Sequence, residues 1–450
     1  MVHDVIAACN DAVAMLRSVP RSNRIRVVSH YDADGISAAG ILCTALYRAG
    51  YEFHATLMRN PFTKGFDRLR DEHNELILFS DMGSGQIETI EQLGSKAIIL
   101  DHHQFVQTKT SERIIQINAN LYGQDGNYDA SGATLSYLFA TALDPANEDL
   151  AALALAGATG DKQFIGGVRG VNKQILQTAL QKNLLSETIG IKLSGETLAE
   201  ALYYAADPYY PGISGNHDAI QKTLEQLHID KTTPLQEVPA EAMTRVQSFL
   251  MFQLIKAGCQ PNILEMIIRK RYTALQGWEL ERFADLLDAC GKNGYRSLGL
   301  TLCLGNGDVW NQAVVVEKDY KQKILDGLRL LEQGGIHETA TMRYFYADNS
   351  SLGGVIAGIA MNYVLDEKKP LFSLTRKQDD DEVHVSCRGN QMLVSQGFDL
   401  GSAMKSVAAD LKGYGGGHKI AAGATVAFGK EKEFLEKVEK VLLEQMKGRA

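Results

Sequence analysis

Three short apolar runs near the start of the chain each end directly in acidic residues. They read RVVSHYDAD, LILFSD and AIILDHH, and each has the length and the Val, Ile and Leu content of a buried strand. Helical patterns separate the runs, which predicts a parallel sheet covered on both faces. Because ligands bind beyond the carboxyl ends of parallel strands, we expect the acidic residues to meet in one crevice.

The same periodicities predict an α/β fold with three parts. A parallel-sheet domain comes first, a mainly helical region follows, and a smaller α/β domain ends the chain; the expected ranges are 1–170, 171–334 and 335–450. The expected strands of the first domain are 24–29, 52–57, 75–80, 96–100 and 113–117. Its expected helices include 36–48 and 85–93.

The later parts of the chain carry weaker patterns. An amphipathic helix is expected at 278–290, with its Glu and Arg residues facing solvent. In the last domain we expect helices at 354–365 and 400–411 and strands at 371–374 and 383–387. The basic segment IIRKRY at 267–272 is best interpreted as a solvated cluster at the end of a helix, rather than as a nucleic-acid track.

The composition is that of a globular enzyme, with 45% hydrophobic and 22% charged residues among 450. No apolar run approaches the roughly 20 residues that cross a bilayer, and the first residues do not resemble a signal peptide. Six scattered cysteines without a CxxC pair favour core thiols in a reducing cytoplasm. The net charge of −8 argues against coating nucleic acid through bulk positive charge, but a nuclease cleft is itself acidic until cations bind.

Two of the acidic signals are weak when each is taken alone. In HYDADG, Asp32 and Asp34 follow a strand at a spacing that allows both carboxylates to hold divalent cations, and Gly35 permits a tight turn. The commoner interpretation of such a motif is a solvated turn. Asp81 in FSDMGSG also follows a strand and is equally weak by itself.

The third signal is more specific. Asp101, His102 and His103 follow the apolar run KAIIL directly, so imidazole groups lie where the carboxylates are expected to gather. Asp161 in GATGDKQ adds a further carboxylate at the end of an Ala-rich helical segment. A mixed Asp and His set without thiolates favours manganese, or magnesium as the alternative, over structural zinc.

Taken in order, these motifs resemble the DHH phosphoesterase superfamily. HYDADG, SDMG, DHH and GATGDK are followed downstream by SCRG and GGGH, so the likeness covers nearly the whole chain. Within the superfamily the chain resembles RecJ-like single-strand exonucleases most, in particular their archaeal relatives. The resemblance implies a DHH catalytic domain and a C-terminal DHH-associated domain that binds substrate. The superfamily's pyrophosphatases use a different basic motif in their second domain.

The resemblance implies two divalent cations, with manganese preferred, bridged by the carboxylate of Asp81. Asp32 would hold one ion together with Asp81, and His30 would complete that site in some members of the family. The remaining ligands of the other ion would be Asp34, His102 and Asp161. Such a pair of ions activates a water for in-line attack on a phosphate, so no covalent intermediate is needed.

Other residues would act around the ions. The resemblance implies that Asp101 orients its neighbours and that His103 faces the scissile phosphate, as a contact or as the acid for the leaving oxygen. In the C-terminal domain, Arg388 can grip a phosphate through two donors. Close approach of a strand to the backbone is expected at Gly415, Gly416 and Gly417, with a donor from His418. Taken alone, this segment reads equally well as a flexible loop.

Three functions follow from this interpretation. The first is an exonuclease on single-stranded DNA or RNA, acting in replication or repair. The second is a phosphodiesterase for short oligoribonucleotides or cyclic dinucleotides, although ~160 residues between the two lobes favour a longer substrate. The third is a replication scaffold that binds the GINS complex, although a scaffold would not need the complete ligand set. None of the three predicts a membrane partner.

Overall fold

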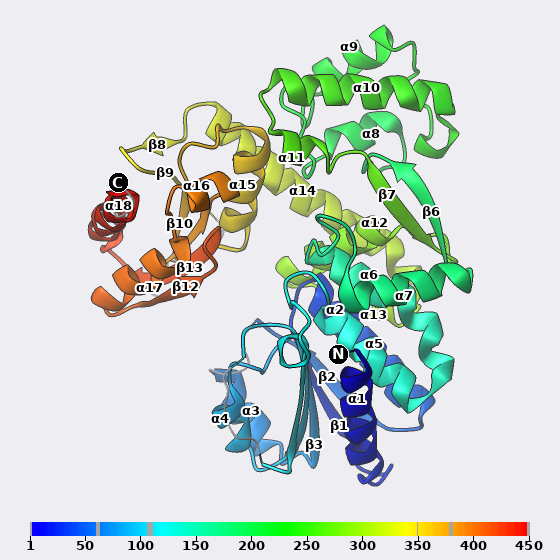
Figure 1. Ribbon diagram of the computed structural model, residues 1–450. Coiled ribbons are helices and arrows are strands. Elements are labelled where there is room, and N and C mark those ends of the chain that lie inside the picture. The colour runs from blue at the N-terminus through cyan, green and yellow to red at the C-terminus, as the bar shows by residue number, and fades with distance from the viewer. Residues whose placement is uncertain (1, 60–63, 106–110, 349, 378–380, 448–450) are drawn as a thin grey trace. The chain divides into compact units, whose positions relative to one another are not determined.

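The structure is a computed structural model that describes residues 2–59, 64–105, 111–348, 350–377 and 381–447 (Figure 1). It forms two compact units. Unit 1 comprises Met1–Ile189 and Lys270–Glu317, and unit 2 comprises Gly190–Arg269 and Lys318–Ala450. The predicted boundaries near residues 170 and 334 divide the chain into consecutive segments, whereas each unit combines two separate segments. These boundaries therefore stay a prediction.

Unit 1 is built on a five-stranded sheet in which every neighbouring pair is parallel, with the order β2-β1-β3-β4-β5. The strands are β1 (Ile25–Ser29), β2 (Phe53–Leu57), β3 (Leu76–Ser80), β4 (Lys96–Asp101) and β5 (Ile114–Asn118). The predicted parallel α/β sheet is therefore confirmed. The sheet register pairs Ser29 with Ser80 and Ser80 with Leu100, so the residues after β1 and β3 and at the end of β4 leave the sheet at one edge.

The helices of unit 1 cover this sheet and continue the core. They are α1 (Val2–Arg17), α2 (Ala33–Arg48), α3 (Lys64–Asp71), α4 (Ile87–Glu91), α5 (Gly132–Leu143), α6 (Ala151–Gly160), α7 (Gly170–Gln181), α12 (Leu280–Lys292) and α13 (Arg296–Cys303). A short ribbon of β6 (Leu185–Gly190) and β7 (Arg269–Ala274) joins the region, and α14 (Trp310–Glu332) begins in unit 1. The helix expected at 85–93 is only the five residues of α4.

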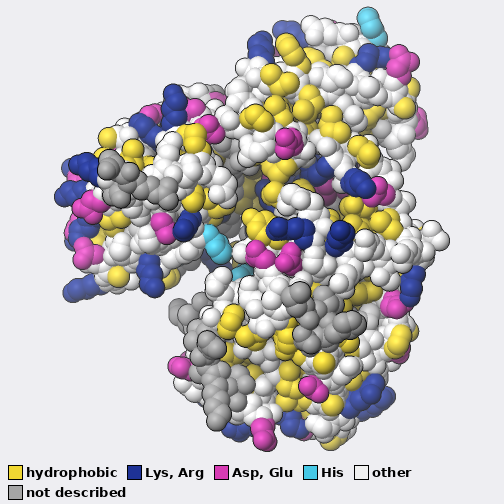
Figure 2. Space-filling view, in the orientation of Figure 1, with side chains coloured by type: hydrophobic (Ala, Val, Ile, Leu, Met, Phe, Trp, Pro, Cys, Tyr) yellow, Lys and Arg dark blue, Asp and Glu magenta, His cyan; other side chains and the backbone are white. Residues whose placement is uncertain are grey.

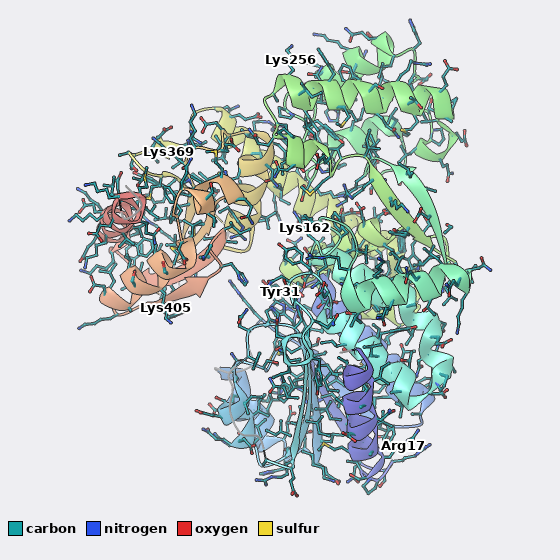
Figure 3. The ribbon with its side chains drawn as sticks, in the orientation of Figure 1. Arg17, Tyr31, Lys162, Lys256, Lys369 and Lys405 are labelled. Atoms are coloured by element: carbon teal, nitrogen blue, oxygen red, sulfur yellow. The ribbon has the colours of Figure 1, made fainter. Side chains whose placement is uncertain are left out.

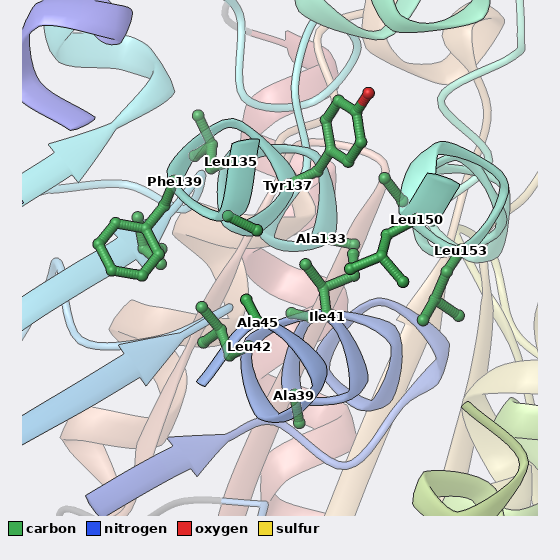
Figure 4. Close-up of a cluster of buried hydrophobic side chains, with 14 of the residues drawn as sticks. Ala39, Ile41, Leu42, Ala45, Ala133, Leu135, Tyr137, Phe139, Leu150 and Leu153 are labelled. Atoms are coloured by element: carbon green, nitrogen blue, oxygen red, sulfur yellow. The ribbon is translucent and has the colours of Figure 1, made fainter. Parts of the chain in front are cut away.

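Helix α2 lies at the centre of the core. It is apolar on nearly all sides and packs against α5, α6, α12 and α13, so it has no wide solvent face. Ile41 and Leu42 of α2 meet Ala133 and Phe139 of α5, and all four are fully buried (Figure 4). Burying such side chains contributes roughly 1.5–3 kcal/mol each, so the middle of α2 is anchored in the core.

Unit 2 combines helices with a mixed six-stranded sheet. The helices are α8 (Leu198–Tyr203), α9 (His217–Gln226), α10 (Ala240–Lys256), α11 (Pro261–Leu264), α15 (Ser350–Tyr363), α16 (Gln391–Ser395), α17 (Leu400–Asp410) and α18 (Glu431–Lys447). The sheet has the order β12-β13-β11-β10-β9-β8. Its strands are β8 (His337–Glu338), β9 (Arg343–Tyr346), β10 (Leu371–Lys377), β11 (Glu382–Arg388), β12 (Tyr414–Gly417) and β13 (Ala421–Ala427).

This second α/β unit confirms the predicted fold class, with only the pair β9 and β10 parallel. The glycine-rich segment is strand β12 rather than a loop. Among the described residues, no helix combines the length and the apolar character that crossing a membrane requires.

Candidate metal centre

The HYDADG motif forms the turn between β1 and α2. Asp32 is the N-cap of α2, and its side chain accepts a hydrogen bond from the backbone N–H of Gly35 at 3.1 Å. The turn is tight, because a Cβ on Gly35 would lie 2.4 Å from the carbonyl oxygen of His30. His30 Nδ1 lies 2.7 Å from the Asp32 carboxylate and 3.4 Å from that of Asp81. Glycine at position 35 thus brings the imidazole and the carboxylates together.

Asp34 lies in the first turn of α2 and is completely buried. It accepts three hydrogen bonds from the N-terminus of α5: from Ser131 Oγ at 2.7 Å, from the N–H of Gly132 at 2.6 Å and from the N–H of Ala133 at 3.0 Å. Donors and the positive end of the helix dipole therefore hold this carboxylate. In the sequence these donors have no local signal beyond the capping pattern of Ser131 and Thr134.

Asp81 lies at the middle of the cluster. Its backbone has the left-handed φ of +57°, which a residue other than glycine adopts only when its surroundings hold it there. Its Oδ1 lies 3.1 Å from His102 Nε2, whereas the buried Oδ2 has no hydrogen-bond partner among the described residues. A buried carboxylate oxygen without a hydrogen bond is costly unless another partner compensates it, and a cation is such a partner.

Asp101 organises the histidine segment. Its carboxylate accepts hydrogen bonds from the backbone N–H groups of Ser84, His102 and His103, and from His103 Nδ1 at 2.8 Å. Asp101 is therefore fully engaged with its own neighbours, which fits the predicted orienting role. The His103 ring is 56% exposed, so its Nε2 edge is open to an incoming molecule.

His102 faces three carboxylates through one ring nitrogen. Its Nε2 lies 3.1 Å from Asp81, 3.2 Å from Asp161 and 3.7 Å from Asp34. Its other nitrogen, Nδ1, donates to the carbonyl oxygen of Gly126 at 2.5 Å. A carbonyl only accepts, so Nδ1 carries a hydrogen, and when the ring is neutral its Nε2 lone pair points into the cluster.

The electrostatics of the cluster favour a bound cation. Burial, followed by the charges of Asp81 and Asp161, raises the pKa of Asp34 well above its usual value. Burial and the neighbouring carboxylates of Asp32 and Asp81 raise the pKa of Asp161 to about 7, although His102 opposes them. The crowded negative charges would be neutralised by protons or by metal ions.

The ligand atoms fall into three overlapping groups in which all lie within 4.8 Å of one another: His30, Asp32 and Asp81; Asp34, His102 and Asp161; and Asp81, His102 and His103. Asp81 belongs to two of the groups. Oxygen and imidazole donors without a thiolate suit manganese or magnesium. The structure thus brings together every residue that the sequence placed at the metal cluster. Tyr31 and Lys162, labelled in Figure 3, are the chain neighbours of Asp32 and Asp161.

Helix α12 supports the same turn from a distant part of the sequence. Asp288 accepts a hydrogen bond from the backbone N–H of Ala33 at 3.0 Å and pairs with Lys292 at 2.5 Å. A Cβ on Gly291 would lie 1.7 Å from the carbonyl oxygen of Tyr31, so this helix packs directly on the motif. The sequence predicted only an amphipathic helix with solvated Glu and Arg residues here, and Glu281 is in fact buried.

The predicted clamp residues lie in unit 2, at one end of its sheet. Arg388 ends β11 opposite Ala421 of β13, and His418 follows β12 in the turn that leads to β13. A Cβ on Gly415 would lie 2.5 Å from a carbonyl oxygen of α17, and one on Gly417 would lie 2.6 Å from that of Ala421. These two glycines are therefore required for packing, whereas a Cβ on Gly416 would meet nothing within 4 Å.

Two residues of the basic segment at 267–272 form ion pairs within unit 1. Lys270 forms an ion pair with Glu187 at 3.0 Å, and Arg271 pairs with Glu279 at 2.7 Å. It forms part of strand β7 rather than a helix end, which corrects the predicted element. On the face shown in Figure 2, basic and acidic side chains are interspersed rather than gathered into one broad basic surface.

A bound cation should displace protons from this cluster. Burial alone would lower the pKa of His102, but Asp81, Asp161 and Asp34 raise it well above its usual value, and the pKa of Asp161 is about 7. Both groups therefore hold protons near pH 7 in the metal-free chain, and ligation removes them. We expect manganese to release protons from the chain and to bind more weakly as the pH falls.

Calorimetric titration at pH 7 in two buffers of different ionisation enthalpy measures this release. Asp161→Asn should release fewer protons than the parent. Equal binding heats in the two buffers would show that no proton leaves the site.

Carboxylates and imidazoles gathered at the strand ends of a parallel sheet are typical of α/β hydrolases that use divalent cations. Two family models identify a particular family within this class. The family model for the DHH family, N-terminal domain, matches residues 24–158, and the model for the DHHA1 domain matches residues 341–444. The chain therefore belongs to the DHH superfamily and is a RecJ-like DHH phosphoesterase.

Individual relatives agree with this assignment. An uncharacterized protein of Methanocaldococcus jannaschii is 29% identical over 430 residues, which is 94% of each chain. The single-stranded-DNA-specific exonuclease RecJ of Thermus thermophilus is 27% identical over 209 residues, 43% of this chain and 30% of that protein.

Two solved structures share the fold. RecJ of Thermus thermophilus in complex with Mn²⁺ matches 97% of this chain and 55% of its own, with a TM-score of 0.62 and 17% identity. CDC45 from Entamoeba histolytica matches 96% of this chain and 99% of its own, with a TM-score of 0.65 and 13% identity. This chain thus covers about half of the solved RecJ chain.

Proposed function

We propose that this chain is an exonuclease that hydrolyses phosphodiester bonds in single-stranded nucleic acid, with two divalent cations and a role in DNA replication or repair. The observation that carries the proposal is the Asp81 carboxylate, which is shared by two ligand groups and keeps one buried oxygen without a hydrogen bond. The Thermus relative is named as a single-stranded-DNA-specific exonuclease, which supports the same substrate class here.

The residues at the centre divide the work. Asp81 would be shared by both cations, with His30 and Asp32 on one side; the ligands on the other side would be Asp34, His102 and Asp161. Manganese is the preferred ion and magnesium the alternative. When bound, two such ions activate a water and neutralise the charge that develops on the phosphate.

His103 would act on the substrate itself. Burial alone would lower its pKa, but the hydrogen bond to Asp101 and the charge of Asp81 raise it to about 9. In the metal-free chain the ring is therefore protonated at neutral pH, and it exposes its Nε2 edge. It would donate a hydrogen bond to the phosphate or a proton to the leaving oxygen, with Asp101 fixing the orientation of the ring.

Arg388 and the backbone around Gly416 would hold the strand. The Arg388 side chain is half-buried, and its Nη1 donates to the carbonyl oxygen of Cys387 at 2.9 Å. Within the described part of the chain, Arg388 forms no ion pair with a carboxylate. A half-buried guanidinium without a carboxylate partner is suited to a phosphate. His418 and the neighbouring glycines would complete the clamp.

Arg388→Ala should chiefly weaken strand binding. Loss of a contact that is equal in the ground and transition states raises KM with little change in kcat. Because one phosphate contact is lost, the slope of log affinity against log salt should fall by about 0.7 for a single strand. Binding of a labelled strand across a salt series, with calcium in place of manganese, measures both effects.

Matched backbone variants sharpen this test. Gly416→Ala has room for its methyl group and should weaken binding only if a strand approaches the backbone there. Gly307→Ala has equal room, far from the clamp in the sequence, and should bind like the parent. Parental affinity of Arg388→Ala at every salt concentration would remove the C-terminal unit from strand binding.

The proposed reaction is tested with end-labelled single strands of DNA and RNA in manganese. A ladder that shortens from one end, with a circular strand left intact, is expected of an exonuclease. Cutting of the circle would mean an endonuclease, and no cutting of either strand would reject the nuclease assignment.

Two alternatives give different outcomes. A phosphodiesterase for short oligoribonucleotides or cyclic dinucleotides would lose rate as the substrate lengthens, so a length series separates it from the exonuclease. A replication scaffold would bind the GINS complex without turnover; the fold shared with CDC45 motivates this alternative. The complete ligand set in unit 1 favours catalysis over a scaffold role alone.

A further inference from the structure

A buried carboxamide lies behind the metal centre of unit 1. Gln163 follows Asp161 by two residues and is only 2% exposed. Its Nε2 donates to two carbonyl oxygens, that of Gly126 at 3.0 Å and that of Ala130 at 3.1 Å. One side chain therefore holds both ends of the segment 126–130 against the end of α6.

The first of these carbonyls also orients His102. The oxygen of Gly126 accepts the Nδ1 hydrogen of His102 as well as the hydrogen bond from Gln163. The backbone at Gly126 also packs closely on the histidine segment, because a Cβ on Gly126 would lie 1.9 Å from the carbonyl oxygen of His102. Gln163 thus fixes the acceptor that directs the His102 Nε2 lone pair toward the carboxylates.

The second carbonyl leads to Asp34. Ala130 directly precedes Ser131, Gly132 and Ala133, the three residues whose donors hold the Asp34 carboxylate. Holding the Ala130 carbonyl therefore also fixes the start of α5. The Gln163 amide therefore constrains His102 through the carbonyl of Gly126 and Asp34 through the carbonyl of Ala130.

A second carboxamide sets the orientation of the first. Asn172 of α7 is 1% exposed, and its Nδ2 donates to Gln163 Oε1 at 2.6 Å and to the carbonyl oxygen of Tyr128 at 3.3 Å. Because Oε1 accepts from Asn172, the Nε2 of Gln163 must face the two carbonyls. The amide could not turn over without placing oxygen against oxygen.

We propose that Gln163 is a positioning residue of the metal centre, which sets His102 and Asp34 for one of the two cations. This inference rests on the proposed two-cation centre and goes beyond it. Residues that orient metal ligands typically change metal affinity by ~10–100-fold when they are replaced. A purely structural amide would instead change the stability of the metal-free chain and leave its affinity for manganese intact.

Two substitutions test the proposal in the full chain. Gln163→Met keeps the length of the side chain and removes both hydrogen bonds. Gln163→Glu keeps the acceptor for Asn172 and replaces the donor with an oxygen that repels both carbonyls. Gln174→Glu introduces the same charge at an exposed position of α7 and serves as the control.

Free manganese is measured by electron paramagnetic resonance during titration of each protein, together with the melting temperature without metal. We expect ~10-fold weaker binding at one site for Gln163→Met and a larger loss for Gln163→Glu. Gln174→Glu should bind like the parent. At saturating manganese, KM for a single strand should stay parental, since these residues lie behind the ligands.

The possible results of the titration distinguish the positioning role of Gln163 from the proposed metal-dependent nuclease activity. If the parent binds no manganese, the metal centre is overturned and the role of Gln163 with it. If the parent binds but both Gln163 variants bind equally well, with only their melting temperature lowered, the amide is structural and this inference alone is overturned. If neither variant folds, Asn172→Ala retains Gln163 and should still weaken manganese binding several-fold; parental affinity there would overturn the inference.

Discussion

Asp81→Ala is expected to lower the rate of strand hydrolysis by at least ~10³-fold while the chain stays folded. One oxygen of Asp81 faces His102 and the other lies on the side of His30, so the carboxylate belongs to both halves of the centre. Its loss disturbs both cations at once. Single-turnover hydrolysis of a labelled strand in saturating manganese measures the effect.

Because the backbone at Asp81 is left-handed, the alanine variant needs an asparagine variant beside it as a control. Alanine at a φ of +57° is strained by roughly 1–2 kcal/mol, whereas asparagine tolerates that region well. Asp81→Asn therefore removes the charge with the least backbone strain, and it should lose nearly as much activity. Asp11→Ala, an exposed substitution in α1, should change neither rate nor melting temperature. A well-folded Asp81→Asn with near-parental turnover would exclude Asp81 from the centre.

The proposed ligands at the strand ends could be predicted from the sequence, because the pattern that places them is local in the chain. Buried parallel strands are almost continuously apolar, so their ends are visible where Asp81 and Asp101 interrupt the pattern. The in-register pairing of Ser29, Ser80 and Leu100 then brings those ends to one edge. Spacing and strand order together were enough to collect the proposed ligands.

The residues that hold the proposed ligands in place could not be predicted in this way, because their contacts join segments that are distant in the sequence. Ser131 lies 97 residues from Asp34, and Asp288 lies 255 residues from Ala33. Neither pair has a local signature beyond a helix cap or a polar position on an amphipathic helix. Gln163 stands beside Asp161 in the printed motif, yet only the fold shows that it reaches two carbonyls. Tertiary packing, not periodicity, assigns these partners.

The structure of the glycine-rich segment at 415–417 could be predicted only in part from the sequence. Three consecutive glycines suggested either close approach of a ligand or a flexible loop, and the sequence could not decide. In the structure they form an edge strand, with Gly415 and Gly417 packed against backbone and only Gly416 open. A count of glycines therefore overstates the part of this segment that is available to a substrate.

Removing divalent cations should abolish hydrolysis altogether. Without a cation, burial and neighbouring carboxylates raise the pKa of both Asp34 and Asp161, so protons would take the place of metal. A protonated His102 has no ring lone pair for a cation, and protonated carboxyl groups no longer carry the negative charge that attracts one. Excess EDTA should therefore leave no measurable turnover, and manganese added beyond the chelator should restore it, with magnesium as a weaker substitute.

The fold itself should survive this treatment, because its core does not depend on the ions. Ile41 of α2 and Phe139 of α5 are fully buried, and Ile41 lies beyond the first turn of α2, which carries Asp34. Circular dichroism in EDTA should match that of the metal-loaded chain, with only the melting temperature lowered. Recovery on adding manganese then distinguishes an emptied centre from an unfolded protein. Turnover that persists at the full rate in EDTA would refute the two-cation centre, since no other described group of His and Asp side chains in this chain could replace it.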